Sequence, residues 1–222
     1  MQVMKCKFLL GALMGVSLLL SFGACTPSSS GGDYIVSGVL PDSTADGYDI
    51  YLVRQDDWKR VDTAIVQGDR FVFEGHVETP AFCRLHVKPG LSSCLILEKG
   101  EIKLDYTKSK YPSGTGSNDE LARINQMEDN QMREFNRGMR KAIREKKGVM
   151  AYKEEYIQNV KKQARELFKE HRDDAVGQYL LYSSYMNILD DEERKEVIQS
   201  LGPSLQSSSR VQYLQKQLNY QK

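Results

Sequence analysis

The stretch Val61–Val77, VDTAIVQGDRFVFEGHV, constrains the fold more than any other part of the chain. On each side of Gly68, apolar or β-branched residues alternate with more polar ones, most clearly at Phe71 and Phe73. This period of two is typical of a strand with one buried face. Glycine readily takes the positive φ that a tight turn between strands needs. The stretch therefore predicts a core β-hairpin, and around it a small antiparallel sheet domain.

Similar short segments, separated by turns rich in Pro, Gly, Asp and Ser, predict seven strands in the first half of the chain. The predicted strands are Tyr34–Leu40, Asp49–Arg54, Val61–Val66, Arg70–Val77, Phe82–Val87, Cys94–Leu97 and Ile102–Tyr106. Short strands at this close spacing are typical of an antiparallel β-sandwich or a partly open barrel. We therefore expect a β domain over residues 34–107.

The second half of the chain is charged and has helical periodicity. Ser117 and Glu120 have the spacing of a capping box, with Ser117 as the N-cap and Glu120 at the third helical position. Apolar residues then recur at intervals of three and four. We expect a helical region over residues 117–222, with four to five helices near 117–146, 151–170, 175–189, 190–202 and 210–220. The predicted fold class is α+β.

The N-terminal segment has the features of a secretory signal. A basic start with Lys5 and Lys7 precedes an apolar run that is short for a membrane-spanning helix. Phe22-Gly23-Ala24-Cys25 then resembles the lipobox of bacterial lipoproteins, in which the signal is cut before the cysteine and the thiol is acylated. We expect a signal peptide at 1–24, a lipid anchor at Cys25 and a flexible linker over 25–33. The alternative is an ordinary signal peptide with a chance cysteine at its end.

The charge balance and the segment after Cys25 bear on the partners and the cellular localisation of the protein. The chain has 31 basic and 30 acidic side chains, a net charge of +1. A strongly basic face is typical of nucleic-acid binding, so we expect no nucleic-acid partner. The overall charge balance also gives no case for electrostatic binding to membranes. The segment Arg133–Lys147 has mixed sign, which is typical of a solvated helix face. No acidic run follows Cys25, so we expect a periplasm-facing position at the outer membrane.

Cys83 and Cys94 remain once Cys6 of the signal and Cys25 are set aside. They lie in consecutive predicted strands, and neighbouring strands are about 5 Å apart, which is within disulfide reach if the register pairs the two residues. A structural disulfide is therefore the first interpretation in an oxidising compartment. Two buried free thiols are the second interpretation, and a redox-active pair is the third.

Asp56, Asp57 and Trp58 form a candidate ligand loop after the second strand. An exposed Trp beside carboxylates would suit a sugar or a peptide, whereas the alternative is a Trp that covers the end of the sheet core. The three histidines lack the spacing of metal ligands. The chain also lacks a Ser-His-Asp order, a phosphate loop and a nucleotide fingerprint. We therefore expect no catalytic residue, no metal and no cofactor.

Several segments together resemble a known family. They are Tyr34–Gly38, Ile50–Leu52, Val61–Ala64, Gly68–Gly75, Pro80, Leu97–Gly100 and Gly116–Asn118. This pattern resembles the uncharacterised N-terminal β domain, with its following helical segment, of a group of periplasmic lipoproteins. In that group a thioredoxin-like thiol–disulfide oxidoreductase domain usually follows. The present sequence has no Cys-x-x-Cys, so the resemblance carries no thioredoxin activity to these residues.

These features predict a lipid-anchored periplasmic binding or interaction module without catalytic activity of its own. Its partner would be another protein or a second copy of the chain. Tyrosines of the helical region, such as Tyr152 and Tyr156, are either helix contacts or a partner surface. One alternative is an accessory of thiol–disulfide exchange that acts with a separate thioredoxin-like protein. A second alternative is a binder of small ligands or glycans at the Trp58 loop.

Overall fold

A computed structural model of the protein describes residues 33–88, 91–146 and 148–220. The predicted signal peptide, the lipidation site Cys25 and the linker up to residue 32 lie outside the described residues. The remainder, from Gly31 to Lys222, forms one compact unit. The β part and the helical part are therefore described together.

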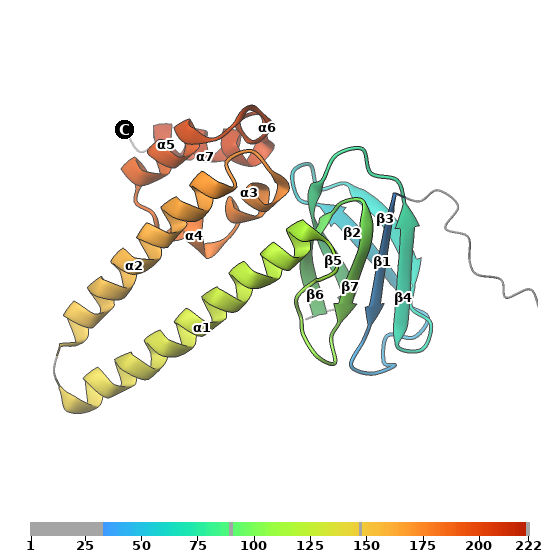
Figure 1. Ribbon diagram of the computed structural model, residues 1–222, viewed down its shortest axis with the longest axis horizontal. Coiled ribbons are helices and arrows are strands. Elements are labelled where there is room, and N and C mark those ends of the chain that lie inside the picture. Colours follow the sequence, from blue (N-terminus) through green and yellow to red (C-terminus); the bar gives the residue numbers. More distant parts are fainter. Residues whose placement is uncertain (1–32, 89–90, 147, 221–222) are drawn as a thin grey trace, which may run out of the picture. The chain divides into compact units, whose positions relative to one another are not determined.

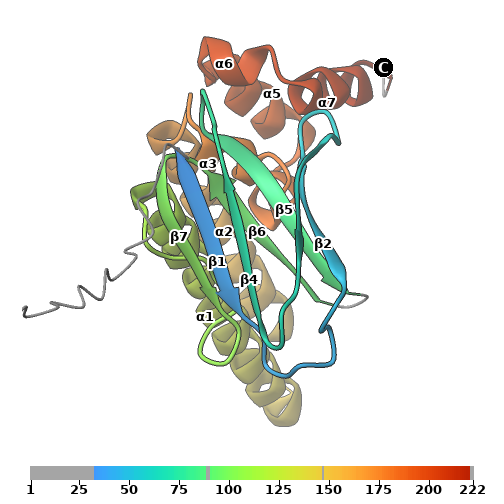
Figure 2. The ribbon, with the colours of Figure 1, turned by 90° about the vertical axis from the view of Figure 1, so that its right-hand side faces the viewer.

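The β part has seven strands in two sheets, which lie one behind the other (Figure 2). The strands are β1 (Tyr34–Val39), β2 (Asp49–Arg54), β3 (Arg60–Ile65), β4 (Arg70–Gly75), β5 (Ala81–Lys88), β6 (Leu91–Leu97) and β7 (Gly100–Asp105). One sheet has the order β4-β1-β7 and the other the order β3-β2-β5-β6. The sheets do not close into a barrel, so the sandwich form of the predicted α+β fold is confirmed.

The predicted hairpin of Val61–Val77 is wrong in its pairing, although its turn is right. Gly68 has φ 64°, and Gln67 and Arg70 exchange two backbone hydrogen bonds of 2.8 and 3.1 Å across it. Beyond this turn the strands separate, because β3 pairs with β2 in one sheet and β4 pairs with β1 in the other. The turn therefore carries the chain from one layer of the sandwich to the other.

Two glycine–aromatic pairs explain why β4 prefers β1. Gly38 of β1 lies opposite Phe71, and Tyr34 lies opposite Gly75. A Cβ atom at Gly38 would lie 2.0 Å from the Phe71 ring, and one at Gly75 would lie 2.4 Å from the Tyr34 hydroxyl. Each ring thus covers a strand position that only glycine can occupy. β1 also pairs with β7, in parallel, which departs from the all-antiparallel arrangement that we expected.

The β5–β6 part of the four-stranded sheet is buried on both faces. Cys83, Leu85 and Leu95 belong to the core between the two sheets. Phe82 and Ile96, on the other face, belong instead to the core of the helical part. The described helices therefore complete the hydrophobic burial of this sheet and do not form a separate domain.

Seven helices follow the strands in the described residues. They are α1 (Gly116–Glu145), α2 (Val149–Glu170), α3 (Ala175–Leu180), α4 (Ser184–Ile188), α5 (Asp191–Ser200), α6 (Pro203–Gln206) and α7 (Ser209–Tyr220). The single helix predicted over 175–189 is divided, because the Ser183 side chain caps a new helix by accepting from the Tyr185 N–H. Pro203 stands at the first position of α6, where its fixed φ suits the start of a helix.

The predicted capping box at Ser117 and Glu120 is wrong. The N-cap of α1 is Thr115, and the Ser117 hydroxyl donates to Glu98 at 2.7 Å instead. Asn118 fixes the helix to the sheet: it is fully buried, accepts from the Ile96 N–H at 2.9 Å and donates to the Ile96 carbonyl at 2.8 Å. Its amide thus satisfies both backbone groups of an edge strand, as a neighbouring strand would.

Candidate functional site

The two long helices α1 and α2 run side by side, and their joined ends extend away from the strands (Figure 1). We call residues 131–146 of α1 and 148–159 around the start of α2 the distal arm. It contains no fully buried residue. Three of its apolar side chains are strongly exposed: Met132 at 47%, Ile143 at 59% and Met150 at 73%. Apolar surface without cover on this scale is typical of a binding surface.

A stack of aromatic rings holds the two helices of the distal arm together. Phe135 of α1 stacks on Tyr156 of α2 with ring centroids 4.2 Å apart, and its centroid lies 6.0 Å from that of Tyr152. The Tyr152 hydroxyl donates to the carbonyl of Glu134 at 3.3 Å. Gly138 makes this possible, because a Cβ there would lie 2.1 Å from the Tyr152 hydroxyl. Gly138 therefore leaves the space that the Tyr152 ring occupies.

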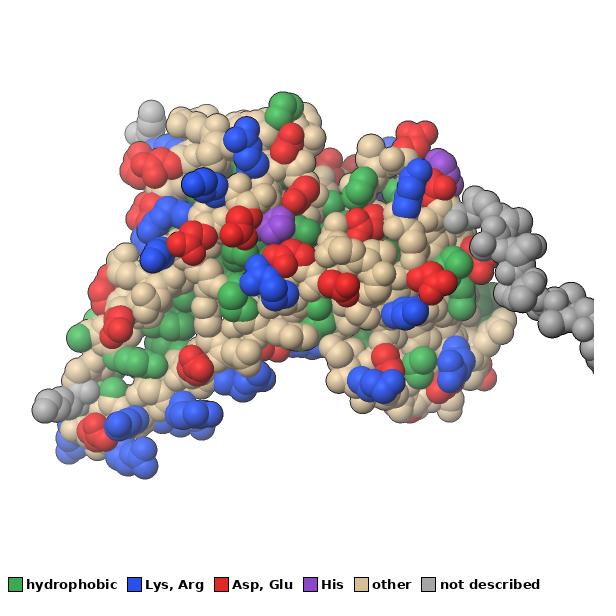
Figure 3. Space-filling view, viewed as in Figure 1, with side chains coloured by type: hydrophobic (Ala, Val, Ile, Leu, Met, Phe, Trp, Pro, Cys, Tyr) green, Lys and Arg blue, Asp and Glu red, His purple; other side chains and the backbone are tan. Residues whose placement is uncertain are grey.

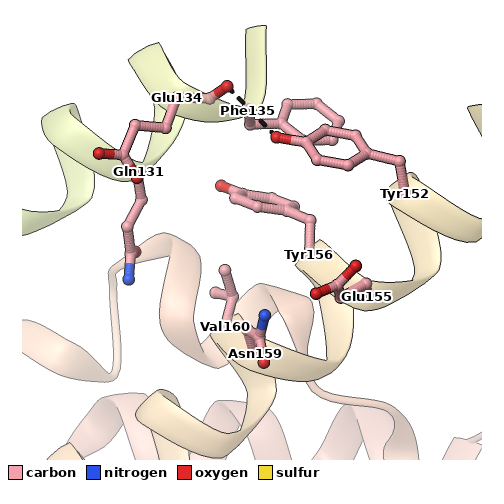
Figure 4. Close-up of a pocket in the computed structure, with 8 residues that line it drawn as sticks. All are labelled: Gln131, Glu134, Phe135, Tyr152, Glu155, Tyr156, Asn159 and Val160. Carbon is pink, nitrogen blue, oxygen red and sulfur yellow. Dashed lines mark hydrogen bonds between the residues drawn. The ribbon is translucent and has the colours of Figure 1, made fainter. Parts of the chain in front are cut away.

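A groove of about 300 Å³ lies beside this stack. Its lining residues are Gln131, Glu134, Phe135, Tyr152, Glu155, Tyr156, Asn159 and Val160. Figure 4 shows Tyr156 reaching from α2 into the space between the helices, with its hydroxyl end directed toward Gln131 and Glu134. Burial and the nearby Glu128 carboxylate raise the pKa of Tyr156, so this hydroxyl stays protonated as a hydrogen-bond donor.

The chemistry of the groove favours a cation. Glu134 and Glu155 are exposed carboxylates at its rim, and neither has an ion-pair partner among the described residues. The floor is aromatic, and the face of an aromatic ring attracts ammonium and guanidinium groups. Carboxylates above an aromatic floor therefore suit a lysine or arginine side chain of another molecule.

The three residues of the predicted ligand loop have different surroundings in the structure. Asp56 serves the fold, because its carboxylate accepts from the Ser209 N–H at 2.8 Å and from the Ser209 hydroxyl at 2.9 Å, at the start of α7. Asp57 accepts from Arg54 at 2.6 and 2.9 Å, and this guanidinium holds the pKa of the carboxyl far below its usual range. Trp58 is 68% exposed and has φ 60°, so it does not cover the sheet core.

Cys83 and Cys94 do not form the predicted disulfide in this structure. The register pairs Cys83 with Leu95 and Cys94 with Arg84, so the two cysteines are one position out of register. Because side chains alternate across a sheet, Cys83 points into the sandwich core and Cys94 toward the helices. Burial raises the pKa of Cys83 to about 12, and burial also raises the pKa of Cys94. Both groups are therefore protonated thiols at neutral pH, with little nucleophilic character.

The aromatic residues of the groove were visible in the sequence only as helix contacts or a partner surface. Tyr152 and Tyr156 follow the spacing of one helix face, and Phe135 follows that of another. Their pairing depends on how the two helices align, which no local pattern shows. Over the described residues, no group of three or more His, Cys, Asp or Glu side chains is arranged to hold a metal ion.

Comparison with known protein families gives a match for one region of the chain. Residues 34–121 match a family described as Domain of unknown function (DUF4369). The match covers all seven strands and the first turns of α1, so it includes Asn118 and its contacts with β6. No curated protein and no solved structure matches the chain. Among the helices that the structure describes, none is both long enough and apolar enough to cross a membrane.

Proposed function

We propose that the protein is a lipid-anchored binding module of the cell envelope, without catalytic activity of its own, and that its partner is a protein. The observation that carries this proposal is the groove of the distal arm. Its aromatic rings and unpaired carboxylates are held by helices that bury nothing else there. A basic side chain of the partner would enter the groove, stack on Tyr156 and pair with Glu134 or Glu155.

The sandwich supports this role as a scaffold. Asn118 and the core around Phe82 and Ile96 fix α1 to the β5–β6 part of a sheet, which is buried on both faces. A rigid base of this kind holds a binding surface in one orientation, which lowers the entropic cost of binding.

Site-specific photo-crosslinking tests the binding proposal. A photoreactive amino acid at Asn159, on the groove rim, is expected to capture one main protein in intact cells through a segment that contains Lys or Arg. Replacement of Phe135 by Ala, or of Glu134 and Glu155 by Gln, should lower the yield about tenfold or more. Glu166→Gln is the matched control, because Glu166 is an exposed carboxylate of α2 outside the groove. Equal yields from all variants would contradict the proposal.

A separate experiment tests the expected lipid anchor at Cys25. Labelled palmitate should be incorporated into the wild-type protein and not into a Cys25→Ser variant. Palmitate incorporation by the Cys25→Ser variant would refute acylation at this cysteine.

The thiol–disulfide accessory is the second proposal, and it would depend on the thiols of a separate protein. Cys83 and Cys94 are poorly suited to thiol–disulfide exchange, because both are buried thiols with raised pKa values. Capture of a thioredoxin-like protein by the Asn159 crosslinker would favour this alternative, and the partner's own cysteines would then carry out the exchange.

A further inference from the structure

A row of arginines follows the outer face of α1 in the distal arm. Arg133, Arg137, Arg140 and Arg144 are spaced by four, three and four residues, which places them on one side of the helix. With a rise of about 1.5 Å per residue the row is about 16 Å long. We call it the arginine row. It is a different surface from the groove, because none of the four residues lines that cavity.

Little charge compensates the arginine row, although the Asp129 carboxylate interacts electrostatically with Arg133. None of its members makes an ion pair with a described residue, and the bonds that they form go to neutral oxygens, such as that of Arg140 to the Asn136 carbonyl at 3.1 Å. Residues 133–146 contain six basic and two acidic side chains, a net charge of +4. The whole chain has a net charge of only +1, so this segment alone is strongly basic. Figure 3 shows Lys and Arg side chains gathered toward the free end of α1.

Exposed apolar side chains accompany these charges. Met132 and Ile143 are eleven residues apart and so share one side of α1, and Ile143 lies three residues from Arg140 on the helix surface. Met150 adds a third apolar side chain at the start of α2, and it is the most exposed of the three. Basic residues beside exposed flexible apolar side chains are the combination found in helices that lie on anionic membranes.

We propose that this outer face of the distal arm lies on a bilayer surface rich in anionic phospholipids. The guanidinium groups of the arginine row pair with lipid phosphates, for which their planar fork is well suited. Met132 and Ile143, on the adjoining side of α1, enter the region below the headgroups. A helix face with a straight row of charge and no cavity fits an array of phosphates in a plane better than the acidic side chains of a folded protein.

The position of the N-terminal connection agrees with this orientation. The carbonyl of Asp33 accepts from the Gly100 N–H at 2.8 Å, and Gly100 lies against Thr115, the N-cap of α1. The chain therefore leaves the folded part near the foot of α1. The eight peptide links from Cys25 to Asp33 can span at most about 29 Å, so the proposed anchor would hold the folded part close to its bilayer. A molecule with α1 along the surface brings anchor and arginine row to the same membrane.

Vesicle co-sedimentation tests this inference on the mature chain with Cys25→Ser, so that acylation does not mask the contact. Vesicles with about a third of phosphatidylglycerol in phosphatidylcholine should bind the protein at low salt, and binding should fall steeply near 0.5 M salt. Pure phosphatidylcholine vesicles should bind little. Arg137→Gln combined with Arg140→Gln should weaken binding about 30-fold, since each charge near such a surface contributes about fivefold.

The matched control replaces Lys162 and Lys169 by Gln. Both are exposed bases of α2 outside the distal arm, with no ion pair to a described residue, and binding should change less than threefold. Circular dichroism confirms that the variants fold. Equal binding to both kinds of vesicle, or unchanged binding by the arginine variant, would overturn the inference. Binding to poly-glutamate in the absence of vesicle binding would assign the face to an acidic protein instead. Loss of crosslinking at Asn159 with vesicle binding retained would count against the groove and not against this inference.

Discussion

The two halves of the α1–α2 pair have the same kind of sequence and opposite surroundings. The half near the sheet carries fully buried side chains, such as Ile124 of α1 and Phe168 of α2, which pack with α3 and α5 into the helical core. In the distal arm the apolar spacing continues, yet no residue is fully buried. An amphipathic pattern thus shows that a helix has an apolar face, and the length of the neighbouring elements decides how much of that face is covered.

This difference indicates where the protein tolerates amino-acid substitutions. The covered half is constrained on all sides by close packing. The distal arm is constrained mainly by the ring stack of Phe135, Tyr152 and Tyr156. Matched substitutions in the two halves should therefore have unequal effects on the free energy of unfolding and, in the arm, unequal effects on binding.

The largest contrast is expected from phenylalanine truncation. Phe168→Ala should lower the free energy of unfolding by about 3–5 kcal/mol, because it leaves a cavity in a closed core. Phe135→Ala should lower it by only about 1 kcal/mol, roughly the value of an aromatic pair at a half-exposed site. Urea unfolding followed by circular dichroism measures both values. Equal losses would show that the arm is packed as tightly as the core.

Alanine at glycine positions should give the second contrast. A Cβ at Gly177 would lie 1.9 Å from the backbone carbonyl of His171, so Gly177→Ala should cost about 3 kcal/mol of unfolding free energy. At Gly138 the Cβ would meet only the far end of the Tyr152 ring, which can move. Its displacement is offset by the better helix propensity of alanine, so a change below about 1 kcal/mol is expected for Gly138→Ala. A large loss at Gly138 in the same urea experiment would mean that Tyr152 is held rigidly.

The smallest effect concerns the pH dependence of the covered half. His171 bonds Asp174 at 2.9 Å and Glu120 at 3.3 Å, and chiefly the Asp174 bond raises the pKa of the imidazole above its ordinary value of about 6.5. A raised pKa in the folded state means that the stabilisation is complete below about pH 6.5 and is lost as the pH rises through the folded-state pKa.

His171→Gln should therefore lower the free energy of unfolding by about 1 kcal/mol near pH 5 and by less near pH 8.5. Thermal unfolding at both pH values measures the difference. A larger loss for His171→Gln at the higher pH would contradict this assignment.

Much of the β part follows from local sequence, because alternation identifies buried faces and glycine identifies turns. All seven predicted strands lie within three residues of the observed ends, and Gly68 has the expected positive φ. The pairing of β4 with β1 does not follow from alternation, since this pattern says nothing about partners. A signal for it does exist in Gly38 and Gly75, the strand glycines that lie opposite aromatic rings.

The candidate sites follow from the sequence less well. Trp58 is exposed as a ligand residue would be, but Asp56 and Asp57 serve α7 and Arg54, which are contacts made in the folded chain. The arginine row was read as part of a solvated face of mixed sign. Its spacing was present in the sequence, but whether salt bridges neutralise it depends on which elements lie beside the helix. The groove depends on the alignment of two helices and could not be derived from either one alone.

The central place of β1 has a consequence for the order of assembly. β1 is the first strand to be synthesised, and its two neighbours, β4 and β7, begin at residues 70 and 100. One edge of β1 must therefore stay open until β4 has emerged, and the other until β7, the last strand of the domain, has emerged. Contacts so distant in sequence slow folding, and open strand edges invite association with other chains during this delay. A chaperone that shields the residues of β1 during this delay would prevent such association.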